Sequence, residues 1–118
     1  MLENNVLIVG GGHAGVEAAL ALSRMKVFCS IITLDAGAVG RLSCNPAVGG
    51  LAKSHLVKEI DALGGIMGVA SDLCAIQFKT LNKTKGRAVW AARAQVDKKK
   101  YPVYINKIIK KNKYIKII

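Results

Sequence analysis

The glycine-rich segment after the first apolar run is the feature that most limits what this chain can fold into. Val6–Val9 are consecutive aliphatic residues, and Gly10, Gly12 and Gly15 then satisfy the pattern G-x-G-x-x-G directly before an alanine-rich helical segment. In that setting the first glycine permits a tight strand-to-helix turn, the second lets a pyrophosphate approach the backbone, and the third lets the helix pack on the strand. The segment therefore predicts a dinucleotide-binding loop, with a glycine-rich turn in an unrelated α/β protein as the alternative. The predicted cofactor-binding residues are Gly10, Gly11, Gly12, His13, Ala14 and Gly15.

The order of the predicted elements is that of the first half of a Rossmann-type nucleotide-binding fold. The unbroken aliphatic run predicts a parallel strand that is buried on both faces. Right-handed crossovers between parallel strands should place the next two strands of this sheet on one side of the first. The predicted strands are 5–9, 27–34, 74–81 and 114–118, and the predicted helices are 14–25, 51–63 and a long one over 91–111 that Pro102 interrupts. Residues 36–50 are expected to form a loop, and 66–73 are either a short helix or an irregular crossing.

Length and composition exclude several classes of protein. A chain of 118 residues with 52% hydrophobic residues is one domain at most and is not disordered. It has neither an apolar run long enough for a membrane span nor a basic N-terminal region that would indicate a signal peptide. We therefore expect a cytoplasmic protein without membrane association. Its three cysteines should be thiols, because their spacing matches neither a C-x-x-C redox pair nor a zinc site.

The positive charge is concentrated at the end of the chain. Residues 98–118 contain eight lysines and no acidic residue, so this segment carries +8 of the net charge of +11 of the whole chain. Such a run can bind nucleic acid by neutralising phosphates, and it can equally be the solvated face of a lysine-rich helix.

Three polar side chains outside the glycine loop are candidates for a functional role. Asp35 lies 20 residues after Gly15, about where a carboxylate accepts hydrogen bonds from a ribose, although an acid at the start of a loop is common. His55 lies in a predicted amphipathic helix, where a surface histidine is the simpler interpretation. Cys44 precedes Asn45–Pro46, and proline disfavours helical backbone at the residue before it, so the thiol is expected in a turn.

Several segments together resemble one family. They are the glycine loop with Glu17–Ala19, then 43–50 (Ser-Cys-Asn-Pro-Ala-Val-Gly-Gly), 55–65, 76–78, 82–86 and 93–95, in that order. The chain resembles, over about residues 6–97, the glucose-inhibited division protein A family, the FAD-dependent tRNA uridine 5-carboxymethylaminomethyl modification enzymes (MnmG). The two middle blocks are far more specific than the glycine motif.

The resemblance implies an enzyme that modifies the wobble uridine (U34) of certain tRNAs. It implies FAD as cofactor, NADH and methylene-tetrahydrofolate as co-substrates, the GTPase MnmE as partner, and a homodimer that forms a heterotetramer with that partner. Residues 1–118 would then be the N-terminal part of the FAD-binding domain, with 98–118 as its lysine-rich end. Cys44 matches the family's functional cysteine, a nucleophile or acid/base toward the uridine ring, and Arg41 and Lys53 nearby in sequence would favour its thiolate. Cys29 and Cys74 match no such role and are expected to be packing residues.

The resemblance also implies that this chain is a piece of a longer protein. The second half of the flavin domain, the NADH-binding insertion and the helical partner-binding domain have no counterpart here. We therefore expect the isolated chain to be inactive in turnover and to bind FAD weakly or not at all. Two other functions stay open: a non-catalytic basic RNA-binding module, and a generic FAD- or NAD-dependent disulfide oxidoreductase. The lack of a second cysteine near Cys44 disfavours the oxidoreductase, which would need two thiols close in sequence.

Overall fold

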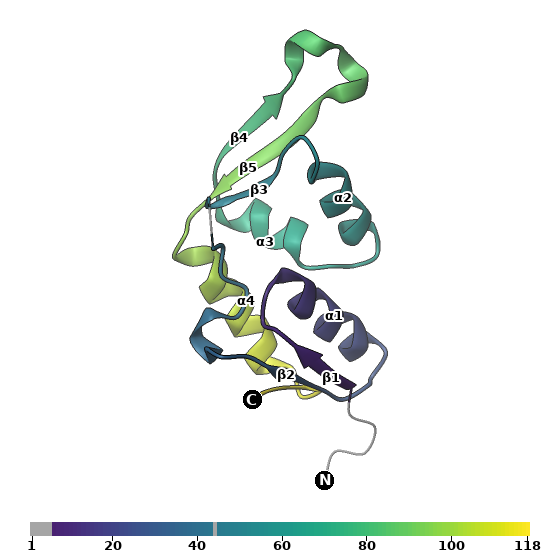
Figure 1. The fold of residues 1–118 in the computed structure, drawn as a ribbon, viewed down its shortest axis with the longest axis vertical. Coiled ribbons are helices and arrows are strands. Elements are labelled where there is room, and N and C mark those ends of the chain that lie inside the picture. Colours follow the sequence, from purple (N-terminus) through teal and green to yellow (C-terminus); the bar gives the residue numbers. More distant parts are fainter. Residues whose placement is uncertain (1–5, 44) are drawn as a thin grey trace. The chain divides into compact units, whose positions relative to one another are not determined.

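The computed structural model describes residues 6–43 and 45–118, and it divides into two compact units (Figure 1). The first unit runs to Arg41 and resumes at Pro102–Ile118, and the second is Leu42–Tyr101. Length alone did not predict this division. In the described residues no helix is long and apolar enough to cross a membrane.

The first unit is a three-stranded parallel sheet with the α/β order expected of a Rossmann-type fold. Strands β1 (Val6–Val9), β2 (Cys29–Ile32) and β6 (Ile115–Ile117) lie in the order β1-β2-β6, so both later strands are on one side of β1, as predicted. Helix α1 (His13–Arg24) connects β1 to β2, and the short 3-10 helix η1 (Ala36–Ala38) follows β2.

The core of the first unit lies between α1 and β2. Ala19 of α1 packs with Cys29 and Ile31 of β2, and all three are fully buried. Val16 and Leu20 complete the buried stripe of the helix at the spacing that an amphipathic helix requires. Burial of β1 on both faces was predicted wrongly for the described residues: Leu7 and Val9, which share one face of the strand, are 56% and 83% exposed.

The second unit is a three-stranded antiparallel sheet with two helices. Strands β3 (Ala47–Gly49), β5 (Ala91–Val96) and β4 (Ala75–Leu81) lie in the order β3-β5-β4. The helices are α2 (Ser54–Ala62) and α3 (Met67–Cys74), and the turns η2 (Lys83–Lys85) and η3 (Arg87–Val89) join β4 to β5. The region 66–73 is thus helical. Residues 36–50 were predicted as loop throughout, but they also contain η1 and β3.

The long helix predicted over 91–111 is wrong in its first half. Residues 91–96 form the central strand β5, and α4 is only Lys100–Lys111. Pro102 therefore lies in the first turn of α4, where proline is tolerated, and the helix continues past it to Lys111.

Asp97 determines where this last helix begins. Its carboxylate accepts hydrogen bonds from the backbone N–H groups of Lys99 and Lys100 at 2.8 and 3.0 Å. These bonds, that from Lys100 above all, lower the pKa of Asp97. The side chain thus supplies a cap between β5 and α4 that sequence reasoning missed.

Candidate functional site

The glycine loop connects the carboxyl end of β1 to the first turn of α1. The N–H of Gly10 donates to the carbonyl of Ile32 at 2.8 Å, which continues the ladder between β1 and β2, and Gly10 then turns with φ of 107°. The carbonyl of Gly12 accepts from the N–H of Val16 at 2.9 Å and so begins the helix. Only a residue without Cβ adopts the Gly10 backbone conformation readily.

Gly15 and Gly12 need to be glycine for different reasons. A Cβ on Gly15 would lie 2.1 Å from the carbonyl oxygen of Gly10, so the helix approaches the loop too closely for any side chain. A Cβ on Gly12 would meet nothing within 4 Å. The space beside Gly12 is thus open, as a loop that admits a pyrophosphate requires.

The loop is held from the other side by the segment after β2. The carbonyl of Gly11 accepts a 2.8 Å hydrogen bond from the N–H of Gly40. A Cβ on Gly11 would lie 2.9 Å from Cγ2 of Val39 and 3.3 Å from Oγ1 of Thr33. The loop is therefore fixed before any ligand arrives.

The first turn of α1 has the chemistry of an anion site. Gly12 occupies the N-cap position, and no side chain caps the helix there. The N–H groups of the first turn carry the positive end of the helix dipole, and a phosphate is the ligand that such a turn accepts. The residues predicted from the motif are thus brought together in one loop, and its open face fits the pyrophosphate of a dinucleotide.

His13, the first residue of the helix, is half-buried beside this loop. Burial lowers the pKa of its imidazole below the ordinary value of 6.5, and the carboxylate of Glu17 opposes that shift. The ring is therefore neutral at pH 7 and adds no cation to the site.

The shifted pKa of His13 predicts a pH-dependent stability. The imidazole of His13 binds its proton more tightly in the unfolded chain than in the folded chain. The contribution of the neutral ring to the stability of the fold is therefore fully present above about pH 7. It is lost as the pH falls through the unfolded-state value of about 6.5 toward the folded-state pKa. We expect His13→Gln to remove this loss between about pH 7 and pH 5, as measured by chemical denaturation at several pH values. His55→Gln is the matched control, because His55 is exposed on α2. The same dependence of the unfolding free energy on pH in His13→Gln and in the parent would contradict the expectation.

Asp35 follows the end of β2 by three residues, and its carboxylate already has a structural role. Its Oδ1 accepts the N–H of Gly37 at 2.8 Å and caps η1. The side chain is otherwise exposed, and its role toward a ribose stays a prediction.

Cys44, the predicted catalytic residue, lies outside the described residues. The other two cysteines are buried thiols: Cys29 is 0% exposed and Cys74 is 6% exposed. Burial raises the pKa of both thiols, and the carboxylate of Asp97 raises that of Cys74 further against a smaller opposite effect from Lys100. Both are therefore poor nucleophiles, in keeping with their predicted packing role.

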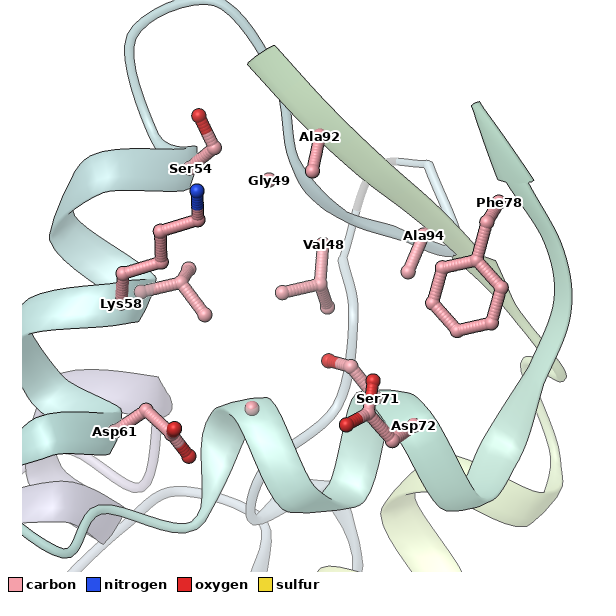
Figure 2. Close-up of a pocket in the computed structure, with 12 residues that line it drawn as sticks. Val48, Gly49, Ser54, Lys58, Asp61, Ser71, Asp72, Phe78, Ala92 and Ala94 are labelled. Carbon is pink, nitrogen blue, oxygen red and sulfur yellow. The ribbon is translucent and has the colours of Figure 1, made fainter. Parts of the chain in front are cut away.

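The second unit contains a groove that sequence reasoning missed (Figure 2). It has a volume of about 270 Å³ and lies between the two helices and one face of the sheet. Val48, Ala92 and Ala94 form its apolar floor and Phe78 one wall, with the polar groups of Ser54, Lys58, Asp61 and Asp72 around it. These residues come from five elements and follow no motif, so no sequence signal could have grouped them.

The chain is similar to one family of known proteins over almost its whole length. The family model described as "Glucose inhibited division protein A" matches residues 5–118. The tRNA uridine 5-carboxymethylaminomethyl modification enzyme MnmG of Campylobacter fetus is 54% identical over 108 residues, which are 92% of this chain and 17% of that protein. The MnmG of Aquifex aeolicus is 53% identical over 116 residues, or 97% of this chain and 19% of that protein. The chain thus spans less than a fifth of the length of these relatives.

Solved structures agree with the assignment of the fold. The structure titled Aquifex aeolicus GidA in the form II crystal superposes with a TM-score of 0.90 at 51% identity, over 97% of this chain and 19% of that one. The p-nitrophenol 4-monooxygenase PnpA of Pseudomonas putida superposes with a TM-score of 0.57 at 13% identity, a likeness of fold alone.

Proposed function

Because the chain belongs to the glucose-inhibited division protein A family, we propose that it forms the phosphate-binding part of the FAD site in an enzyme that modifies the wobble uridine of certain tRNAs. The observation that carries this proposal is the glycine loop. Gly15 packs on the carbonyl of Gly10 while the space beside Gly12 is open. In this family the dinucleotide is FAD, which supplies electron- and hydride-transfer chemistry when bound.

The residues of the loop would divide the work of holding FAD. The backbone N–H groups that follow Gly12 would bind the pyrophosphate. The neutral ring of His13 would lie beside the loop without adding a positive charge to the site. Gly11, fixed by the segment around Gly40, would keep the loop in place. NADH, methylene-tetrahydrofolate, the GTPase MnmE and a homodimeric assembly belong to the same proposal, by the relationship to the family.

Cys44 is the residue proposed to act on the uridine ring. A thiolate can add to an electron-poor pyrimidine carbon or exchange a proton there, and Arg41 and Lys53 are close enough in sequence to favour the ionised thiol. The buried Cys29 and Cys74 are not alternatives, because burial raises the pKa of each.

Titration of the chain with FAD, followed by amide chemical shifts, tests the proposal and detects even weak binding. We expect small shifts at Gly10–Gly15 that increase with the FAD concentration, as weak binding requires. Gly12→Val should abolish them and leave the rest of the spectrum intact, because its side chain enters the open space where the pyrophosphate would lie and meets no protein atom near its Cβ. Leu51→Val, which also ends in a valine side chain, is a control at an exposed position of the other unit. Shifts in the variant equal to those in the parent would rule out the glycine loop as the FAD site.

A further inference from the structure

The hairpin of β4 and β5 is the most one-sidedly charged part of the second unit. Residues 75–96 contain five cationic residues and no acidic one; the cations are Lys79, Lys83, Lys85, Arg87 and Arg93. The hairpin extends away from α2 and α3, with η2 and η3 at its end (Figure 1). An extended surface of this charge attracts polyanions.

Two of these cations lie directly opposite each other in the sheet. In the antiparallel register Lys79 of β4 pairs with Arg93 of β5, and the next pair on the same face is Gln77 with Gln95. Like charges at directly opposite positions destabilise a sheet. Among the described residues no carboxylate forms an ion pair with either side chain. The third strand places Gly49 beside Arg93, so no side chain covers the guanidinium from that strand.

This basic face is not the face that forms the groove. Phe78, Ala92 and Ala94 alternate with the basic residues along the strands and point into the groove between sheet and helices (Figure 2). Lys79 and Arg93 therefore lie on the opposite face of the sheet, where Lys79 and both glutamines are exposed. The sheet thus keeps an unfavourable charge pair in which Lys79 is exposed and Arg93 is half-buried.

The end of the hairpin adds an aromatic group. Trp90 is 46% exposed, and the guanidinium carbon of Arg87 lies 5.7 Å from the centre of its ring. The turn is fixed by Asn82, which has φ of 61° and donates from Nδ2 to the carbonyl of Val89 at 3.3 Å. An exposed indole that is fixed next to cations can stack on an unpaired base.

We propose that this face and end of the β4–β5 hairpin are an RNA-binding surface. Lys79 and Arg93 contact phosphates, Gln77 and Gln95 contact hydroxyls or base edges, and Trp90 stacks on a base of an unpaired nucleotide. The proposal rests on the proposed function, whose substrate is a tRNA, and it names the surface that would hold that substrate. An RNA phosphate between Lys79 and Arg93 would relieve their repulsion.

The hairpin fits RNA better than the lysine-rich end of the chain does. The lysines of α4 lie opposite the buried Ile105 and Ile109, as on the solvated side of any amphipathic helix. The hairpin combines charge with an exposed indole and with amide side chains.

The substitution Lys79→Glu should weaken RNA binding while it stabilises the fold. A carboxylate opposite Arg93 replaces repulsion by attraction, so we expect the thermal midpoint to rise by about 1–5 °C. We expect the affinity for a fluorescein-labelled RNA stem-loop, measured by anisotropy, to fall by about tenfold or more, because two phosphate contacts are lost or opposed. Lys107→Glu is the matched control: it makes the same charge change on the exposed side of α4 and should alter the affinity less than about twofold.

Trp90→Ala should weaken RNA binding about 5- to 100-fold, with an unchanged dependence of the affinity on salt concentration.

Unchanged RNA affinity in Lys79→Glu, or an equal loss in Lys107→Glu, would overturn the proposal. So would a chain that binds phosphatidylglycerol vesicles and not the RNA. The FAD titration keeps the two proposals apart. A parent chain that binds RNA through Lys79, but whose FAD shifts are unchanged by Gly12→Val, would refute the flavin site alone. Lys79→Glu with intact FAD shifts and lost RNA affinity would support the hairpin.

Discussion

Gly15→Ala is expected to destabilise the first unit by about 2 kcal/mol or more. The added methyl group would lie 2.1 Å from the carbonyl oxygen of Gly10 and 3.3 Å from Cγ2 of Ile8, so the first turn of α1 must move away from the loop. Overpacking of this kind costs about 1–3 kcal/mol or more. The higher helix propensity of alanine returns at most about 1 kcal/mol. The steric cost therefore decides the sign.

Urea denaturation of Gly15→Ala and Gly12→Ala side by side measures this effect. Gly12→Ala is the matched control, since its methyl group meets nothing within 4 Å, and it should change the stability by no more than about 1 kcal/mol through the weaker N-cap. Equal stability of the two variants would show that α1 does not approach the loop as described.

Alkylation of the folded chain is expected to reach one thiol of three. Cys29 and Cys74 are buried, and burial raises the pKa of each, so both the access and the thiolate fraction of these side chains are low. N-ethylmaleimide should therefore label Cys44 at least about 100-fold faster than either, if Cys44 is the reactive thiol that we propose.

Peptide mass spectrometry at short reaction times identifies the labelled site. Cys44→Ser should leave the folded chain almost unlabelled, and addition of urea should then expose the other two thiols together with unfolding. Rapid labelling of Cys29 in the folded chain would contradict the packing of β2 against α1, where its Sγ lies 3.9 Å from the carbonyl oxygen of Ala19.

Local sequence patterns predicted the first unit well, because its elements are determined by neighbouring residues. The aliphatic run, the glycines and the alanine-rich segment follow one another, so β1, the loop and α1 could be placed within a residue or two. The site residues Gly10–Gly15 lie in one continuous segment, and they form one loop in the structure.

Patterns failed where pairing with distant residues decides the conformation. Ala91–Val96 contains good helix formers, but it lies between β3 and β4 and forms hydrogen bonds to both. Strand formation depends on such neighbours more than on intrinsic preference. The exposure of β1 has the same origin, because the apolar run shows that a strand forms but not which of its faces another element covers.

The sequence by itself determined the glycine loop, the parallel α/β order of the first unit and the family, because each depends on residues that are adjacent or in fixed spacing. Only the tertiary structure placed Lys79 opposite Arg93, closed a groove from five elements and showed the space beside Gly12 to be open. The physical reason is that strand register and side-chain packing join residues far apart in the chain, and no local pattern records which of them will meet.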